Sequence, residues 1–199
     1  MDKNQKHKES MQKQKEQIDA NIESASIERG VSILLTGNGK GKSSSAFGMV
    51  MRALGYGHKV AVVQFIKGQQ LSGEELYIKN QYPDMYFYQM GTGFTWDTQD
   101  RTADIEAAKT TWLKVAPLLL DASYDLVVLD ELTYMLAFKY LDEDMILTAI
   151  ENRPESQSVV VTGRGGGSAL QDIMDTVSEV KDIKHAYNSG IKARQGVDY

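Results

Sequence analysis

A glycine-rich loop at residues 37–43 directly follows a short apolar run, and this junction restricts the chain to a small group of folds. The loop reads Gly37-Asn38-Gly39-Lys40-Gly41-Lys42-Ser43, and apolar residues recur at helical spacing after it, from Ala46 to Leu54. A buried strand that enters a helix through such a loop builds an anion site, because backbone N–H groups and the helix N-terminus face one point. The sequence therefore predicts a phosphate-binding loop.

Within this loop, Lys42 and Ser43 carry the side chains with the clearest expected roles. A lysine at this position reaches the outer phosphates of a nucleoside triphosphate, and the next hydroxyl holds Mg²⁺. The spacing departs from the ordinary G-x-x-x-x-G-K-[ST] pattern, because Thr36 stands where the first glycine would be. The loop is thus one residue tighter and has an extra lysine, Lys40. A chance glycine-lysine turn is the weaker alternative, since both flanking patterns fit the motif.

Composition narrows the class of protein further. The 199 residues include 42% apolar and 25% charged residues, which suits one well-packed domain. The net charge of −5 argues against a dedicated nucleic-acid binder, which usually has a basic excess. The chain has no cysteine, so disulfides, thiolate metal sites and cysteine nucleophiles are excluded. No apolar run is long enough to span a membrane, and we expect a cytoplasmic protein with no membrane partner.

Strand-like and helix-like segments alternate along the body of the chain. Alternation of this kind predicts an α/β fold, a single P-loop domain of the RecA-like type with a mostly parallel sheet and helices on both faces. The expected domain spans residues 30–199. The expected strands are Val31–Thr36, Lys59–Ile66, Met85–Met90, Tyr124–Leu129 and Ser158–Thr162, and the expected helices lie near 43–54, 101–121, 132–152 and 168–178.

Residues 1–29 differ from the body and form a polar N-terminal arm. The first fifteen residues are rich in Lys, Gln and Glu and are expected to be mobile. From residue 17 on, Ile18, Ile22 and Ala25 recur at helical spacing. Residues 17–28 are therefore either a solvated tail or a short amphipathic helix that docks on the body or on a second subunit.

Two carboxylates follow the fourth expected strand. Asp130 and Glu131 end the run Leu126–Leu129, at the sheet edge where ligands bind in open α/β folds. Downstream of a phosphate-binding loop, such an acid is expected to meet Mg²⁺, directly or through water. The second carboxylate could also activate water, so the pair alone does not separate an ATPase from a transferase.

Three further segments fall at the same expected edge. Phe94 and Trp96 lie two residues apart after Gly91 and Gly93, where they either fill the core or form a wall for a flat apolar substrate. Arg164 lies among glycines after the last expected strand, in either a phosphate contact or a plain surface turn. A lone histidine such as His185 is more often structural than catalytic, and no role is assigned to it.

Together these motifs resemble the P-loop type of ATP:corrinoid adenosyltransferase, also called cob(I)alamin adenosyltransferase. The resemblance covers nearly the whole chain, and the shortened loop together with the Phe-Thr-Trp segment makes it specific. Ser43 stands where the family usually has Thr, so a hydroxyl remains. The matching stretches are Thr36–Ser43 (TGNGKGKS), Val62–Gly68 (VVQFIKG), Thr92–Asp97 (TGFTWD), Val127–Met135 (VVLDELTYM), Val161–Gly165 (VTGRG) and Lys184–Tyr199 (KHAYNSGIKARQGVDY).

The resemblance implies a reaction, two substrates and a set of partners. It implies transfer of the 5′-deoxyadenosyl group of ATP to the Co(I) of a corrinoid, with release of the whole triphosphate and with Mg²⁺ as cofactor. It implies that Lys42 acts catalytically, that Ser43, Glu131 and Asp130 serve the metal, and that Phe94 and Trp96 bind the corrinoid and displace its lower ligand. The ATP-binding residues would be Gly37, Asn38, Gly39, Lys40, Gly41, Lys42, Ser43 and Arg164. A homodimer and an electron donor such as a flavodoxin or flavin reductase are also implied.

Two other interpretations stay open at this point. A small RecA-like ATPase acting on nucleic acid would have a basic surface and polynucleotide-stimulated phosphate release. A non-catalytic nucleotide switch would bind nucleotide tightly without turnover. The net charge and the Phe94/Trp96 segment disfavour the first, and the paired carboxylates weakly disfavour the second.

Overall fold

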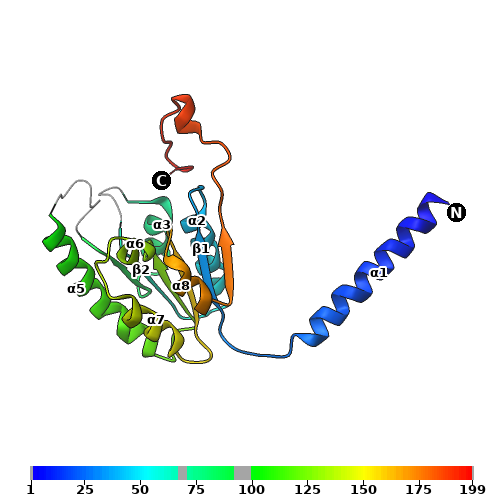
Figure 1. Ribbon diagram of the computed structural model, residues 1–199, viewed down its shortest axis with the longest axis horizontal. Coiled ribbons are helices and arrows are strands. Elements are labelled where there is room, and N and C mark those ends of the chain that lie inside the picture. Colours follow the sequence, from blue (N-terminus) through cyan, green and yellow to red (C-terminus); the bar gives the residue numbers. More distant parts are fainter. Residues whose placement is uncertain (1, 67–70, 92–99, 199) are drawn as a thin grey trace.

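The protein is an α/β structure built on one six-stranded parallel sheet (Figure 1). A computed structural model describes residues 2–66, 71–91 and 100–198. The strand order is β3-β2-β4-β5-β1-β6, and every described strand pair is parallel. This confirms the predicted fold class. The strands are β1 (Ser32–Thr36), β2 (Val60–Gln64), β3 (Tyr86–Gln89), β4 (Leu126–Asp130), β5 (Ser158–Thr162) and β6 (Thr176–Glu179).

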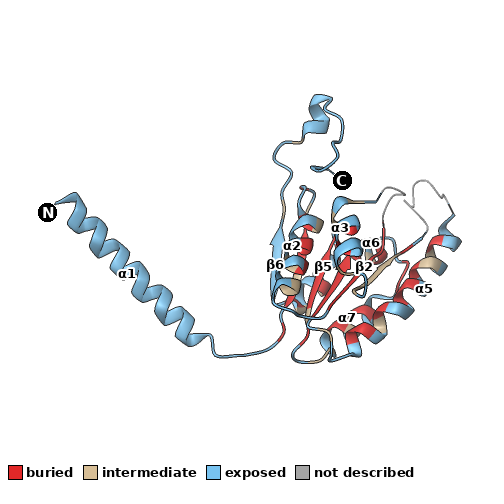
Figure 2. Ribbon diagram, turned by 180° about the vertical axis from the view of Figure 1, so that it is seen from behind, coloured by how far each residue is buried: buried red, intermediate tan, exposed pale blue. Residues whose placement is uncertain are grey.

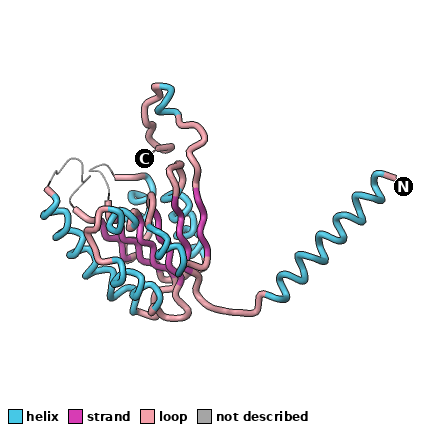
Figure 3. The backbone as a smooth tube through the Cα atoms, in the orientation of Figure 1, coloured by secondary structure: helices cyan, strands magenta, loops and turns pink. Residues whose placement is uncertain are grey.

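Helices cover both faces of the sheet, as Figure 3 shows. On one face lie α2 (Lys42–Gly55) and α3 (Gly73–Gln81). On the other lie α5 (Arg101–Leu120), α6 (Thr133–Ala137), α7 (Glu143–Glu151) and α8 (Gly167–Ile173). A short 3₁₀ helix, η1 (Ala186–Ser189), follows β6.

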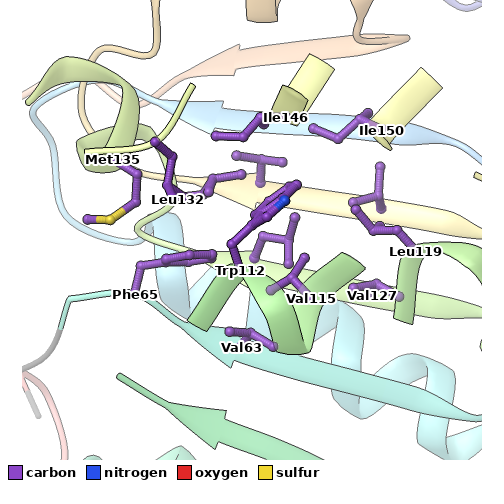
Figure 4. Close-up of a cluster of buried hydrophobic side chains, with 14 of the residues drawn as sticks. Val63, Phe65, Trp112, Val115, Leu119, Val127, Leu132, Met135, Ile146 and Ile150 are labelled. Carbon is purple, nitrogen blue, oxygen red and sulfur yellow. The ribbon is translucent and has the colours of Figure 1, made fainter. Parts of the chain in front are cut away.

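Successive side chains of a strand point to opposite faces of the sheet, so each central strand contributes to two separate hydrophobic cores, one on each face. In β2, Val60 and Val62 pack with Phe47 of α2, whereas Ala61 and Val63 pack on the opposite face. The larger core surrounds Trp112 of α5, which lies among aliphatic side chains from the sheet and from α7 (Figure 4). Both faces of the central strands are therefore buried (Figure 2).

Two expected helices differ from those observed. The single pattern at 132–152 is two helices, because the chain turns at Lys139 with φ of 53° and Asp142 caps the start of α7 through a hydrogen bond from the Met145 N–H. The pattern at 168–178 is also wrong, since α8 ends at Ile173 and Thr176–Glu179 is the edge strand β6. Asp175 accepts hydrogen bonds from the Ser32 N–H and from Arg29, which aligns the chain beside β1.

The N-terminal arm contains a longer helix than its sequence suggests. Helix α1 (Lys3–Ser24) covers the segment expected to be mobile and ends before Ala25. Lys, Gln and Glu favour helix, Asp2 caps its start, and i,i+4 side-chain bonds such as Gln12 to Glu16 support it. No residue of α1 is buried, and the helix lies away from the sheet domain (Figure 2). Within the described part of the single chain, the Ile18/Ile22 stripe therefore stays exposed.

Candidate functional site

The predicted site residues converge at the carboxyl edge of the sheet because the central strands end in register. Gln64 at the end of β2 pairs with Asp130 at the end of β4, and Leu35 of β1 pairs with Thr162 of β5. The glycine-rich loop leaves β1 at this edge and runs into α2. Two adjoining cavities, of about 630 and 530 Å³, open between the loop and the carboxylates.

The glycine-rich loop ends in an open helix N-terminus. Gly41 takes a left-handed conformation with φ of 109° and begins α2 without a side-chain cap. The first N–H groups of an α-helix have no partner within the helix, so this start is suited to an anion. Lys42 is buried, and its Nζ donates a 2.8 Å hydrogen bond to the Gly39 carbonyl. Burial lowers the pKa of Lys42, and the nearby Glu131 charge opposes that shift.

The segment that follows β6 packs against the glycine-rich loop and forms backbone hydrogen bonds with it. The Gly39 N–H donates to the Val180 carbonyl at 2.7 Å, and the Val180 N–H donates to the Thr36 carbonyl at 2.8 Å. A Cβ on Gly37 would lie 2.4 Å from the Val180 carbonyl oxygen, and one on Gly39 would lie 2.6 Å from the Lys181 oxygen. Both glycines are therefore required by close packing against this segment.

Asp130 is fully engaged by neighbouring strands. Its Oδ2 accepts from the Gln64 side chain at 2.8 Å, and its Oδ1 accepts from the Thr162 hydroxyl at 2.6 Å. The residue is 3% exposed. Hydrogen bonds of this kind hold the carboxylate in one orientation, so Asp130 is well placed to support a neighbouring ligand.

In the part of the chain that the structure describes, the Glu131 carboxylate has fewer hydrogen-bond partners than that of Asp130. Glu131 adopts φ of 60°, and its N–H donates to the Thr162 hydroxyl at 3.0 Å. Its Oε2 is buried and has no hydrogen-bond partner among the described residues. Burial and the neighbouring Asp130 charge raise the pKa of Glu131 to about 7, against the opposing effect of Lys42 and Arg164. A buried oxygen without a partner is a candidate ligand for a cation.

The donor set around the cavity fits Mg²⁺ held jointly with phosphates. The Ser43 hydroxyl and the two carboxylates line one cavity, and oxygen donors of this kind suit Mg²⁺. Across the ranges 2–66, 71–91 and 100–198, no group of three or more His, Asp or Glu forms a complete metal cage. Mg²⁺ in nucleotide sites commonly takes one or two carboxylates and completes its shell with water and phosphate oxygens.

Arg164 reaches the cavity from the loop after β5, and two hydroxyls hold that loop. Thr36 donates to the Gly165 carbonyl at 2.9 Å, and Thr133 donates to the Arg164 carbonyl at 2.9 Å. Gly163 has φ of 138°, and a Cβ there would lie 2.1 Å from the Thr133 hydroxyl. The glycines beside Arg164, which carry no role in the sequence interpretation, thus permit a tight turn that presents a cation to the loop.

Most of the residues predicted for ATP and metal line these cavities. Asn38 through Ser43, Glu131 and Arg164 line the smaller one, and Asp130 lines the larger. Gly37 is packed against Val180 instead. Phe94 and Trp96 lie outside the described residues.

Comparison with known proteins accounts for this combination. The family described as ATP:corrinoid adenosyltransferase BtuR/CobO/CobP matches residues 28–199. The chain belongs to this family. A corrinoid adenosyltransferase of Pseudomonas aeruginosa is 50% identical over 198 residues, covering 100% of this chain and 98% of that protein. Corrinoid adenosyltransferases of Escherichia coli K12 and Salmonella typhimurium are each 45% identical over 195 residues, covering 98% of both chains.

For a corrinoid adenosyltransferase of this type, the site includes residues that sequence reasoning did not single out. Gln64 and Thr162 orient Asp130, and both could have been found as polar residues at the ends of apolar strands. Thr133 holds the Arg164 loop through a hydroxyl that carries no sequence signal, and Thr36, known from the sequence only as a departure from the loop motif, holds it as well. The C-terminal segment also lines the smaller cavity, through Asp182, His185, Tyr187, Asn188 and Asp198.

His185 has a structural role in that segment. It caps η1, and its Nδ1 accepts a hydrogen bond from the Tyr187 N–H at 3.1 Å.

None of the described helices is long and apolar enough to cross a bilayer.

Proposed function

We propose that this protein transfers the 5′-deoxyadenosyl group of ATP to the Co(I) centre of a corrinoid. The electron pair of Co(I) attacks C5′ of the ribose, the C5′–O bond breaks, and the bonding electrons leave with the intact triphosphate. The observation that carries this proposal is the family match over residues 28–199. The alternative of an ATPase acting on nucleic acid has no support in the described features.

The phosphate loop has a specific task in this reaction. The leaving group is the whole triphosphate, so its negative charge must be stabilised as the C5′–O bond breaks. Preorganised charges and N–H groups are the usual means of such stabilisation. Lys42, Lys40 and Arg164 line one cavity beside the start of α2, which supports assigning them to the triphosphate. Because the attacking group is the cobalt centre, no water needs to be activated.

We also propose which residues serve the metal. Ser43 and Glu131 would hold Mg²⁺, with Asp130 in a supporting role, and the bound ion would neutralise part of the triphosphate charge. The support is the partnerless Oε2 of Glu131 beside a fully hydrogen-bonded Asp130.

The remaining assignments rest on the sequence and the family resemblance. Phe94 and Trp96 are proposed as the apolar wall that displaces the lower ligand of the corrinoid. Within the N-terminal arm, residues 17–28 are proposed to cover the active site in a homodimer, since α1 buries none of its residues in the single chain. An external electron donor such as a flavodoxin or flavin reductase would reduce Co(II) to Co(I). The cytoplasmic location stays a prediction.

One assay tests the proposed reaction. The full chain is mixed with ATP, Mg²⁺ and chemically reduced cobalamin, and the light-sensitive spectrum of the adenosylated product is followed. Polynucleotide-stimulated release of inorganic phosphate, without that spectrum, would support the nucleic-acid ATPase instead.

A further inference from the structure

An ion pair joins the end of the chain to the phosphate-binding loop. The Lys40 Nζ lies 2.7 Å from Oδ1 of Asp198, the last residue that the structure describes. Lys40 is the extra lysine of the shortened loop, and its side chain is 49% exposed, whereas that of Asp198 is 23% exposed. A carboxylate therefore contacts the loop at the place where the proposed function puts a triphosphate.

The Asp198 carboxylate is held in this position by its own turn. Its Oδ2 accepts a 2.8 Å hydrogen bond from the Arg194 N–H, and its own N–H donates to the Arg194 carbonyl at 2.7 Å. The other oxygen is thereby directed to Lys40. The hydrogen bond from the Lys40 ammonium and that from the Arg194 N–H lower the pKa of Asp198, so the carboxylate is ionised at neutral pH.

The ion pair belongs to the cavities and is not an isolated surface contact. Asp198 lines both cavities, together with Lys40, Gly41 and Ser43. The segment that carries it extends beyond β6 on the side of the sheet where the loop lies (Figure 3). Gly190 and Gly196 both have positive φ values, of 74° and 79°, and mark bends on the way to Asp198.

We propose that Asp198 is an internal competitor of the triphosphate for Lys40. Before ATP binds, the Asp198 carboxylate is ion-paired with the Lys40 ammonium. When the triphosphate enters, phosphate oxygens replace the carboxylate at Lys40, and Asp198 moves away. After transfer of the adenosyl group, recapture of Lys40 by Asp198 favours release of the triphosphate product. This inference rests on the proposed function, because it assumes that the triphosphate lies against the loop.

Removing the Asp198 charge should change the affinity for the triphosphate only slightly, but the direction of that change is informative. An ion pair with this exposure contributes modestly, so removing the competing charge should tighten triphosphate binding about two- to fivefold. If Asp198 instead helped Lys40 to grip the phosphates, its removal would weaken binding. The direction of the change therefore separates the two roles.

The test is calorimetric titration of inorganic tripolyphosphate into the full chain with Mg²⁺ present. Asp198→Asn should bind tripolyphosphate about two- to fivefold more tightly than the unaltered protein does. Asp198→Glu keeps the charge and should bind it with the same affinity as the unaltered protein. Asp182→Asn is the matched control, because Asp182 lines the same cavity with the same charge, and it should change the affinity less. In a Lys40→Ala background, Asp198→Asn should have no further effect.

Weaker or unchanged binding by Asp198→Asn, or an equal gain from Asp182→Asn, would overturn the proposal. Lys42→Ala distinguishes this failure from failure of the proposed function. If Lys42→Ala loses tripolyphosphate binding while Asp198→Asn has no effect, the phosphate site stands and the competitor role is wrong. If Lys42→Ala binds normally, the placement of the triphosphate is itself wrong.

Discussion

Thr36, which stands where an ordinary phosphate-binding loop has its first glycine, donates a 2.9 Å hydrogen bond to the Gly165 carbonyl. The hydroxyl ties the end of β1 to the loop that carries Arg164. The departure from the common motif therefore couples the two loops on which the proposed triphosphate site depends.

This coupling predicts different results for two substitutions of Thr36. Thr36→Val keeps the shape of the side chain but leaves the Gly165 carbonyl without its hydrogen-bond donor. The KM for ATP should therefore rise about fivefold, which corresponds to the loss of a hydrogen bond that contributes about 1 kcal/mol. Thr36→Ser keeps the hydroxyl and should retain a nearly normal KM. Equal KM values for both variants would show that the hydrogen bond does not position Arg164.

The two carboxylates should differ in their effect on Mg²⁺ use. Asp130 already has a partner for each oxygen, whereas Oε2 of Glu131 has none among the described residues. Glu131→Gln should therefore raise the Mg²⁺ concentration for half-maximal adenosylation about tenfold or more, and Asp130→Asn should raise it less. Titration of activity with Mg²⁺ checks this order, and the reverse order would exchange the two roles.

Glu131→Gln has a second readout in pH-dependent stability. Because the pKa of Glu131 is raised to about 7, its ionised form destabilises the nucleotide-free protein. That cost is absent below the ordinary carboxyl pKa of ~4.3, grows up to about pH 7 and is constant above it. The free energy of unfolding of the variant should thus exceed that of the unaltered protein by about 1–3 kcal/mol near pH 8, with a smaller gain near pH 4, as measured by denaturant unfolding at the two pH values. A gain that did not change with pH would contradict this account.

Much of this architecture follows from local sequence patterns. The loop, β1 and α2 form one contiguous motif, and the buried strands have unbroken apolar runs, so these were predicted close to their observed bounds. Strand β6 could not be predicted in this way, because all four of its residues are exposed and only its pairing with β1 makes it a strand. The contacts of Asp198 with Lys40 and of Thr36 with Gly165 join residues more than a hundred positions apart, and no local pattern reports them.

The aromatic pair Phe94 and Trp96 is predicted from sequence to assist reduction of cobalt. An apolar wall that replaces the lower ligand favours the electron-rich Co(I) state, because that ligand donates electrons to the metal. Phe94→Ala and Trp96→Ala should therefore impair adenosylation strongly from Co(II) with a mild reductant, and much less from Co(I) prepared chemically. Comparing rates under the two conditions tests this, and equal losses would leave the aromatics with only a packing or binding role.

The N-terminal arm should contribute to corrinoid use rather than to folding. Helix α1 buries no residue in the single chain, so deletion of residues 1–28 should leave the unfolding temperature nearly unchanged. If the arm covers the active site of a dimer, the truncated protein should have a higher KM for the corrinoid and an unaltered KM for ATP. An unchanged corrinoid KM would count against the covering role.

The central claim is that the loop holds the whole triphosphate as a leaving group, and product analysis in a single turnover tests it most directly. Adenosylcorrinoid and inorganic tripolyphosphate are quantified together for the unaltered protein and for Lys42→Ala. We expect equal amounts of the two products from the unaltered protein and a rate at least ~10²-fold lower in the variant, since preorganised charge of this kind contributes ~3 kcal/mol or more. ADP and phosphate as the products, or a nearly normal rate in Lys42→Ala, would contradict the claim.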